Sequence, residues 1–239
     1  MNFSDIVGGF VVIDTETTGL KGSVIQLAWK KSDDSPFADI MYDPEIPIEY
    51  GAMAVHGITN KQLQSSDTKS KDYVTKVISD LIEGRFVVGH NMTFDAEAIE
   101  RTFGISLPKD KLFCTLRLAD YLGLKDVVGS LSNGALYYYF KEQSNEDIGV
   151  TNFHDANYDV SVTLYNLGKL LELAGNNNLS ELKERMDTHF IKTCRFPKHD
   201  GVLWEQVVVS DKSYVEWLIN NDKISGDTLD YLIGLMGGR

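Results

Sequence analysis

Cysteine is scarce in this chain of 239 residues, which contains only Cys114 and Cys194. Two distant cysteines cannot build a disulfide framework, and they lack the close spacing of a zinc-binding pair. We therefore expect two buried thiols in a protein of a reducing compartment.

Long apolar runs are also missing. No run approaches the ~18–20 residues that a membrane-spanning helix needs. The first basic residue is Lys21, so the start of the chain lacks the basic segment of a secretory signal peptide. These two absences predict a cytoplasmic protein without a membrane partner.

Positive charge is in deficit. The chain has 35 Asp and Glu against 23 Lys and Arg, a formal net charge of −12. This is the wrong sign for a protein that coats DNA by electrostatic attraction to phosphates. It does not exclude a nuclease that grips a strand end, because bound cations can supply positive charge locally.

What is present is an ordinary globular composition, 43% hydrophobic and 24% charged. Its length allows one or two domains. Short β-rich apolar runs come first, and stretches with helical periodicity dominate later, which predicts an α/β core with a mixed sheet. The expected strands are 10–13, 24–29, 40–42 and 86–88. A capping box at Thr59 is expected to open a short helix. Further helices are expected over 73–82, 94–103, 115–122, 131–140 and 155–174.

The end of the chain has a different character. Residues 1–176 are predicted to form the main domain, 177–190 a linker or connecting helix, and 191–239 a small module near the lower size limit for independent folding. Within 183–199, five Lys and Arg face two Asp and Glu. This segment either contacts DNA phosphates or only solvates a linker, and both interpretations stay open.

Two carboxylates follow the first predicted strand. Asp14 and Glu16, in Val-Ile-Asp-Thr-Glu-Thr-Thr-Gly-Leu, point to the same side because side chains alternate along a strand. Paired carboxylates repel each other, and a divalent cation relieves that repulsion. Gly19 suits a backbone that must approach a ligand closely. Taken alone, an Asp-x-Glu pair is more often an acidic loop.

Two further acidic positions begin predicted helices. Asp95 lies in the first turn of a helix, where an acid is favourable without any other role. His154 comes just before the long helix, Asp155 is its expected N-cap, and Asp159 is one turn inside. His154 and Asp159 can converge only if His154 belongs to the loop that enters the helix.

In this order, the five residues resemble the signature of the DEDDh (DnaQ-like) 3′–5′ exonucleases, within the ribonuclease H-like superfamily. They are Asp14, Glu16, Asp95, His154 and Asp159. The resemblance covers residues 10–174 and includes Ala54-Val55-His56-Gly57-Ile58-Thr59, similar to a His-x-Ile-Thr segment of the family. It implies a ribonuclease H-like mixed β-sheet flanked by helices.

The rest of the chain resembles the exodeoxyribonuclease X branch of that family. Ser132-Asn133-Gly134-Ala135-Leu136 is similar to its middle section, and the tail from Cys194 to Leu218 is similar to its C-terminal segment. Pro197 and Ser213 stand where that branch has glycine. The tail is equally well explained as a packing module and as a DNA-contacting one.

The resemblance implies a chemistry for these residues. Asp14, Glu16, Asp95 and Asp159 would hold two Mg²⁺ ions, which Mn²⁺ can replace, and His154 would take a proton from the attacking water. The expected products are nucleoside 5′-monophosphates. Five further residues are weaker candidates for substrate binding: Thr17, Leu20, Lys21, His56 and Asn91.

Three functions remain open from sequence. The first is an exodeoxyribonuclease that acts on single-stranded or duplex DNA 3′ ends in repair, replication or DNA turnover, which the tail favours. The second is an RNA exonuclease similar to oligoribonuclease or ribonuclease T. The catalytic residues do not separate these two functions, because RNA and DNA are distinguished by contacts to a single 2′-hydroxyl. The third is a non-catalytic adaptor that uses the fold to hold a nucleic acid or a polymerase.

Overall fold

A five-stranded mixed sheet forms the centre of the larger part of the molecule. The computed structural model describes residues 6–144, 148–149 and 156–237. The strand order is β3-β2-β1-β4-β5, with β1–β2 and β2–β3 antiparallel and β1–β4 and β4–β5 parallel. The strands are β1 (Phe10–Thr17), β2 (Val24–Lys31), β3 (Ala38–Met41), β4 (Phe86–Gly89) and β5 (Leu112–Cys114). The predicted mixed sheet is therefore confirmed.

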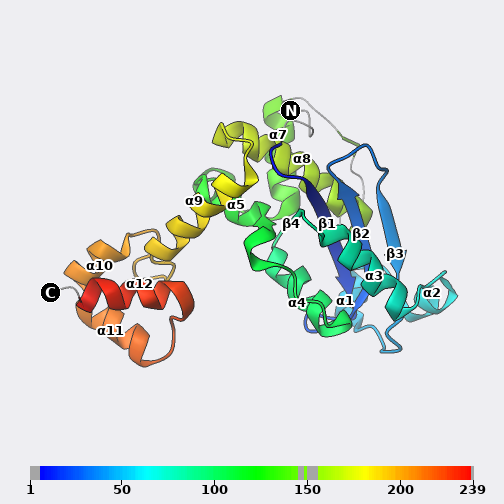
Figure 1. Ribbon diagram of the computed structural model, residues 1–239, viewed down its shortest axis with the longest axis horizontal. Coiled ribbons are helices and arrows are strands. Elements are labelled where there is room, and N and C mark those ends of the chain that lie inside the picture. Colours follow the sequence, from blue (N-terminus) through cyan, green and yellow to red (C-terminus); the bar gives the residue numbers. More distant parts are fainter. Residues whose placement is uncertain (1–5, 145–147, 150–155, 238–239) are drawn as a thin grey trace. The chain divides into compact units, whose positions relative to one another are not determined.

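Helices cover both faces of this sheet (Figure 1). On one face, Val11 and Ile13 of β1 join a buried cluster with residues of α3 (Lys71–Ile82) and α4 (Met92–Phe103). Alternation turns the even-numbered residues of β1 to the opposite face. There α8 (Ala156–Ala174) packs against β1, β2 and β3. This layering confirms the predicted α/β architecture of a mixed sheet flanked by helices.

The β1–β2 connection is a tight turn. Thr18 N–H donates to the Ser23 carbonyl at 2.8 Å, and Gly22 N–H donates to the Gly19 carbonyl at 2.8 Å. A Cβ atom at Gly22 would lie 2.3 Å from Thr18 Oγ1 and 2.5 Å from the Gly19 nitrogen. Only glycine fits this turn, and the turn fixes where the chain leaves β1 beside Glu16.

The remaining helices of this part are short. Thr59 starts α2 with the predicted capping box, since Thr59 Oγ1 accepts from Gln62 N–H and Gln62 Oε1 accepts from Thr59 N–H. The others are α1 (Tyr50–His56), α2 (Asn60–Ser65), the 3₁₀ turn Lys109–Lys111, α5 (Thr115–Tyr121), α6 (Lys125–Val128) and α7 (Asn133–Ser144). Sequence reasoning missed α1, α6 and β5.

The chain divides into two compact units, Met1–Ser180 and Glu181–Arg239. The second contains most of α9 (Leu179–Lys192) and all of α10 (Trp204–Ser210), α11 (Lys212–Asn220) and α12 (Gly226–Gly237). It has its own apolar cluster, which includes Trp204, Val215 and Leu232. Among the described residues, no helix is long and apolar enough to cross a membrane.

Candidate active site

Three carboxylates meet on the α8 face of the sheet. Asp14 and Glu16 lie on β1 opposite Ala28 and Gln26 of β2. Asp159 comes from the first turn of α8. Each of the three acids offers an oxygen, and these oxygens all lie within 4.8 Å of one another. The tertiary structure thus brings together acids that are more than 140 positions apart in the sequence.

Asp95 is the buried member of the acidic group. It lies in the first turn of α4 and is only 3% exposed. Its Oδ1 accepts hydrogen bonds from Thr15 N–H at 3.0 Å and from Thr15 Oγ1 at 2.7 Å. Burial raises the pKa of Asp95 to about 7; the Thr15 hydrogen bonds oppose this shift, and the negative charge of Asp159 adds to it.

This arrangement fits a divalent cation. Asp14, Glu16 and Asp159 provide oxygen ligands, which hard cations such as Mg²⁺ and Mn²⁺ prefer. The raised pKa of Asp95 indicates that negative charge is unfavourable at this position without a compensating positive charge. A bound cation would stabilise the ionised form of all four acids.

His56 connects α1 to the end of β1. Ile58 N–H donates to His56 Nδ1 at 3.0 Å, so the ring proton must lie on Nε2, which donates to the Thr17 carbonyl at 3.2 Å. His56 also borders a cavity of about 300 Å³ whose lining includes Gln26 and Met41. The neutral histidine therefore holds the α1–α2 connection beside the strand that carries Asp14 and Glu16.

The other substrate-binding candidates surround the same strand end or the start of α4. Thr17 is buried and its Oγ1 donates to the Gly19 carbonyl at 2.8 Å. Leu20 is 85% exposed, and Lys21 beside it is also exposed. Asn91 is exposed at the N-cap of α4, with a left-handed backbone (φ 61°).

His154 and Asp155 lie outside the described residues. The expected role of His154 as a base and the expected N-cap at Asp155 therefore remain sequence-based predictions. Of the five signature residues, the structure places Asp14, Glu16, Asp95 and Asp159.

Sequence reasoning missed two residues that hold the acids in place. Thr15 stands between the two acids of the strand motif, and the structure shows that it anchors Asp95. Asn133 Nδ2 donates to the Asp159 carbonyl at 3.3 Å and to Thr163 Oγ1 at 2.9 Å. Asn166 Nδ2 in turn donates to Asn133 Oδ1 at 2.8 Å. The Ser-Asn-Gly segment was the available signal for Asn133.

Comparison with known protein families supports the same assignment. The RNase_T family model, described as exonuclease, matches residues 11–167. The chain belongs to this exonuclease family. The match includes Asp14, Glu16, Asp95 and Asp159, so all the acids described above lie inside the family domain.

Curated relatives of this exonuclease include DNA enzymes. It is 29% identical to Exodeoxyribonuclease 10 of Escherichia coli over 217 residues, which covers 88% of this chain and 90% of that protein. It is 30% identical to the PolC-type DNA polymerase III of Bacillus cereus over 172 residues, covering 68% of this chain but only 11% of the polymerase.

Solved structures agree with the fold. Exonuclease X in complex with 5′ overhanging duplex DNA matches with a TM-score of 0.53 and 26% identity, over 72% of this chain and 98% of that one. Escherichia coli exonuclease I bound to single-stranded DNA matches with a TM-score of 0.57 but only 19% identity, which supports the fold alone. Here the match covers 76% of this exonuclease and 43% of the other chain.

The predicted family is thus confirmed. The protein is a DnaQ-like 3′–5′ exonuclease, a phosphodiester hydrolase that acts on nucleic acids. Enzymes of this family depend on metal ions, and Asp14, Glu16 and Asp159 form an acidic cluster of the kind that could hold one.

Proposed function

We propose that this exonuclease removes nucleoside 5′-monophosphates one at a time from the 3′ ends of DNA, in DNA repair, replication or turnover. The observation that carries the proposal is the cluster of Asp14, Glu16 and Asp159 oxygens within 4.8 Å, in a chain of the exonuclease family. The preference for DNA is supported by the similarity to Exodeoxyribonuclease 10 across 88% of this chain.

The four acids would hold two Mg²⁺ ions, with Mn²⁺ as a substitute. Bound divalent ions stabilise the charge that develops on the attacking and leaving oxygens of a phosphodiester. Asp14 and Glu16 approach from β1, Asp159 from α8 and Asp95 from α4. Thr15 fixes the orientation of Asp95, and Asn133 ties α7 to the turn of α8 that carries Asp159.

His154 would accept the proton of the attacking water. Its ordinary pKa, ~6.5, suits proton transfer near neutral pH. His154 precedes Asp159 by five residues in the sequence. No protein side chain needs to form a covalent bond with the substrate in this scheme.

The substrate end would be held at the β1–β2 turn. Leu20, 85% exposed, would press against the terminal base, and Lys21 would reach a phosphate. The main-chain amides near Thr17 and Leu20 would hold the terminal sugar, while His56 and Asn91 would line the same cleft. Exposure of an apolar side chain at this turn supports a contact with a base.

The domain arrangement is also a proposal. Residues 1–176 would contain the complete nuclease centre, and residues 191–239 would form a separate exodeoxyribonuclease X-like module. Residues 177–190 would be the linker or connecting helix between them. The family match ends at residue 167, which supports this division.

A labelled oligonucleotide tests the proposal. With a 5′ fluorophore, DNA should shorten from its 3′ end in single-nucleotide steps, only when Mg²⁺ or Mn²⁺ is present, and nucleoside 5′-monophosphates should accumulate. The matched RNA strand, of identical sequence, should be degraded much more slowly. Faster degradation of RNA would favour an RNA exonuclease. Absence of hydrolysis of either strand across a metal titration would favour a non-catalytic adaptor.

A further inference from the structure

Three aromatic side chains form a continuous row on the second unit. Tyr214 and Trp217 of α11 are stacked, with ring centroids 6.3 Å apart and an interplanar angle of 12°. His199 lies against Tyr214, with its ring centroid 5.3 Å from that of the tyrosine. Spacing of three residues puts Tyr214 and Trp217 on one face of the helix. We call His199, Tyr214 and Trp217 the aromatic row.

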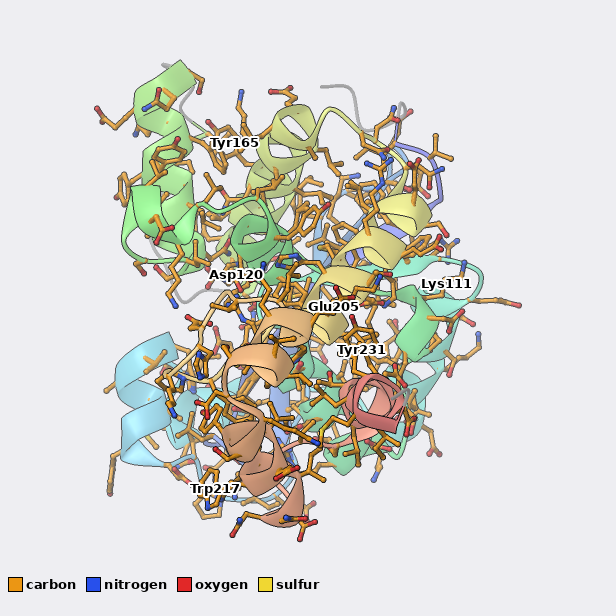
Figure 2. The ribbon with its side chains drawn as sticks, turned by 90° about the vertical axis from the view of Figure 1, so that its left-hand side faces the viewer. Lys111, Asp120, Tyr165, Glu205, Trp217 and Tyr231 are labelled. Carbon is orange, nitrogen blue, oxygen red and sulfur yellow. The ribbon has the colours of Figure 1, made fainter. Side chains whose placement is uncertain are left out.

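Trp217 differs sharply from the core of the same unit, whereas Tyr214 is half-buried and packs against that core. Trp204 is 1% exposed and belongs to the apolar cluster, whereas Trp217 is 52% exposed. Figure 2 labels Trp217 on the second unit. A unit of this size has little apolar surface to bury, so packing alone would favour burying both indoles. An exposed indole that is stacked on a neighbouring tyrosine offers a flat surface on which a planar ligand can stack.

Polar contacts hold the row in place. Asp211, between α10 and α11, accepts hydrogen bonds through Oδ2 from Lys198 Nζ at 2.5 Å and from His199 Nε2 at 2.9 Å. Lys198 Nζ lies 4.8 Å from the centroid of the Tyr214 ring. The row is therefore formed in advance, which lowers the entropy cost of binding a ligand.

The surrounding segment is basic. Residues 188–199 contain Lys192, Arg195 and Lys198 but no Asp or Glu, although Arg195 is paired with Asp200 just beyond the segment and Lys198 with Asp211. Lys198 keeps 57% of its side chain exposed although it is paired with Asp211. A cation such as Lys198 beside stacked aromatic rings matches a ligand that combines phosphates with flat bases.

We propose that the aromatic row is a second binding site for nucleic acid, which takes a single-stranded segment of the strand that the first unit degrades. A base stacks on Trp217 and continues the Tyr214–Trp217 stack, and Lys198 contacts a phosphate. Stacking needs no particular base, so the site is tolerant of sequence. The inference rests on the proposed function, since the exonuclease substrate is its occupant.

Such a site acts through tethering. Because both units belong to one chain, a strand held by the aromatic row stays at high local concentration near the nuclease. The site should therefore matter for long strands and not for a substrate that occupies only the catalytic centre. This difference separates it from a structural role.

Binding is measured with the full-length chain in Mg²⁺ and a fluorescent phosphorothioate dT strand of about 20 nucleotides, longer than the ~4–16 that one binding fold covers. Trp217→Ala should weaken binding by about 5- to 100-fold, the range for removal of one base–aromatic stack. Trp217→Phe keeps a ring and should retain most of the affinity. Ile233→Ala, which removes another exposed apolar side chain of the unit, is the matched control and should bind like the unaltered protein.

Kinetics separate this site from the catalytic centre. Trp217→Ala should raise KM for the long dT strand with kcat unchanged, and should hydrolyse the p-nitrophenyl ester of thymidine 5′-monophosphate at the unaltered rate. An unchanged KM for the long strand would overturn the inference while leaving the proposed function intact. Failure of the unaltered protein to degrade DNA would instead overturn the proposed function.

Intrinsic fluorescence provides an independent check. Stacking of a base on Trp217 should quench part of the tryptophan emission, and Trp217→Phe should abolish that quenching while still binding. Quenching of undiminished size in Trp217→Phe would come from Trp29 or Trp204 and would refute the site. A second result would also refute the site: Trp217→Ala binds DNA with unaltered affinity but self-associates more weakly in light scattering. The aromatic row would then be a contact between protein molecules.

Discussion

Thr15 and Asp95 are 80 positions apart in sequence but are joined by two hydrogen bonds to a single carboxylate oxygen. The main-chain N–H and the hydroxyl of Thr15 both point at Asp95 Oδ1, and both residues are buried. This contact connects β1, which carries Asp14 and Glu16, directly to the helix that carries Asp95. It therefore fixes the buried acid relative to the other acids of the site.

Removal of the Thr15 hydroxyl should impair catalysis. Thr15→Val keeps the side-chain shape and the main-chain bond but removes one donor to a carboxylate, a hydrogen bond of ~1.5–3 kcal/mol. We expect kcat/KM to fall by about 10- to 100-fold, with the acidic limb of its pH profile moved to higher pH because the pKa of Asp95 rises further. Thr75→Val on α3 is the control and should behave like the unaltered enzyme. An unaltered pH profile in Thr15→Val would contradict the role assigned to this bond.

Without metal, the stability of the protein should fall as the pH rises toward neutrality. The pKa of Asp95 is raised to about 7 in the folded state, above its ordinary value of 3.8, so the folded state binds this proton more tightly. The resulting stabilisation is complete below pH 3.8 and is lost as the pH rises to about 7. Over this range the free energy of unfolding should decrease by up to ~4 kcal/mol.

Asp95→Asn tests this linkage, since it cannot ionise. Thermal melting in EDTA should show a smaller decrease of Tm between about pH 4 and pH 8 for Asp95→Asn than for the unaltered protein. Added Mg²⁺ should restore the Tm of the unaltered protein at the upper pH and have less effect on the variant. Parallel Tm profiles in EDTA would argue against the raised pKa.

Removal of an acid from the three-carboxylate cluster should abolish cleavage and leave the fold intact. In Asp14→Ala the repulsion between Asp14, Glu16 and Asp159 is reduced, so Tm in EDTA should be equal to or slightly above that of the unaltered protein. The rise of Tm on adding Mg²⁺ should be smaller, because metal binding stabilises the folded state. Asp34→Ala, at an exposed acid, is the control. Turnover at the unaltered rate in Asp14→Ala would refute the metal site.

His154→Ala should reduce kcat by about 100-fold or more, within the usual range for general base catalysis. Binding of a DNA 3′ end should be largely retained, because the four acids are unchanged. Steady-state kinetics and equilibrium binding are both needed. A change in KM alone would make His154 a binding residue.

Truncation after Ser180, where the first compact unit ends, separates the two units. The shortened protein should hydrolyse the p-nitrophenyl ester of thymidine 5′-monophosphate normally but bind long strands more weakly. The binding constant should also depend less steeply on salt concentration. For each phosphate that the protein no longer neutralises, the slope of log binding constant against log salt should decrease by ~0.7 on a single strand and by ~0.9 on a duplex. An equal decrease in activity on short and long substrates, together with a lower Tm, would indicate that the second unit has only a packing role.

Local rules were sufficient for part of the site. Alternation along one strand requires that Asp14 and Glu16 share a face, whatever the rest of the fold does. The capping box at Thr59 and Gln62 is likewise formed by residues three positions apart, and it was predicted correctly. The eight-residue strand β1 and the long helix α8 also have strong local patterns of apolar residues.

Other features depend on partners that are distant in sequence. β5 has only three residues and is defined by its pairing with β4, and α1 buries none of its side chains, so neither has a recognisable period. The packing of α8 on the sheet brings Asp159 to Asp14, and the folding of α4 brings Asp95 to Thr15. The sequence alone determined which residues are acidic and which of them share a strand. Only the tertiary structure decided that they meet, because long-range packing rather than local periodicity sets the distances between them.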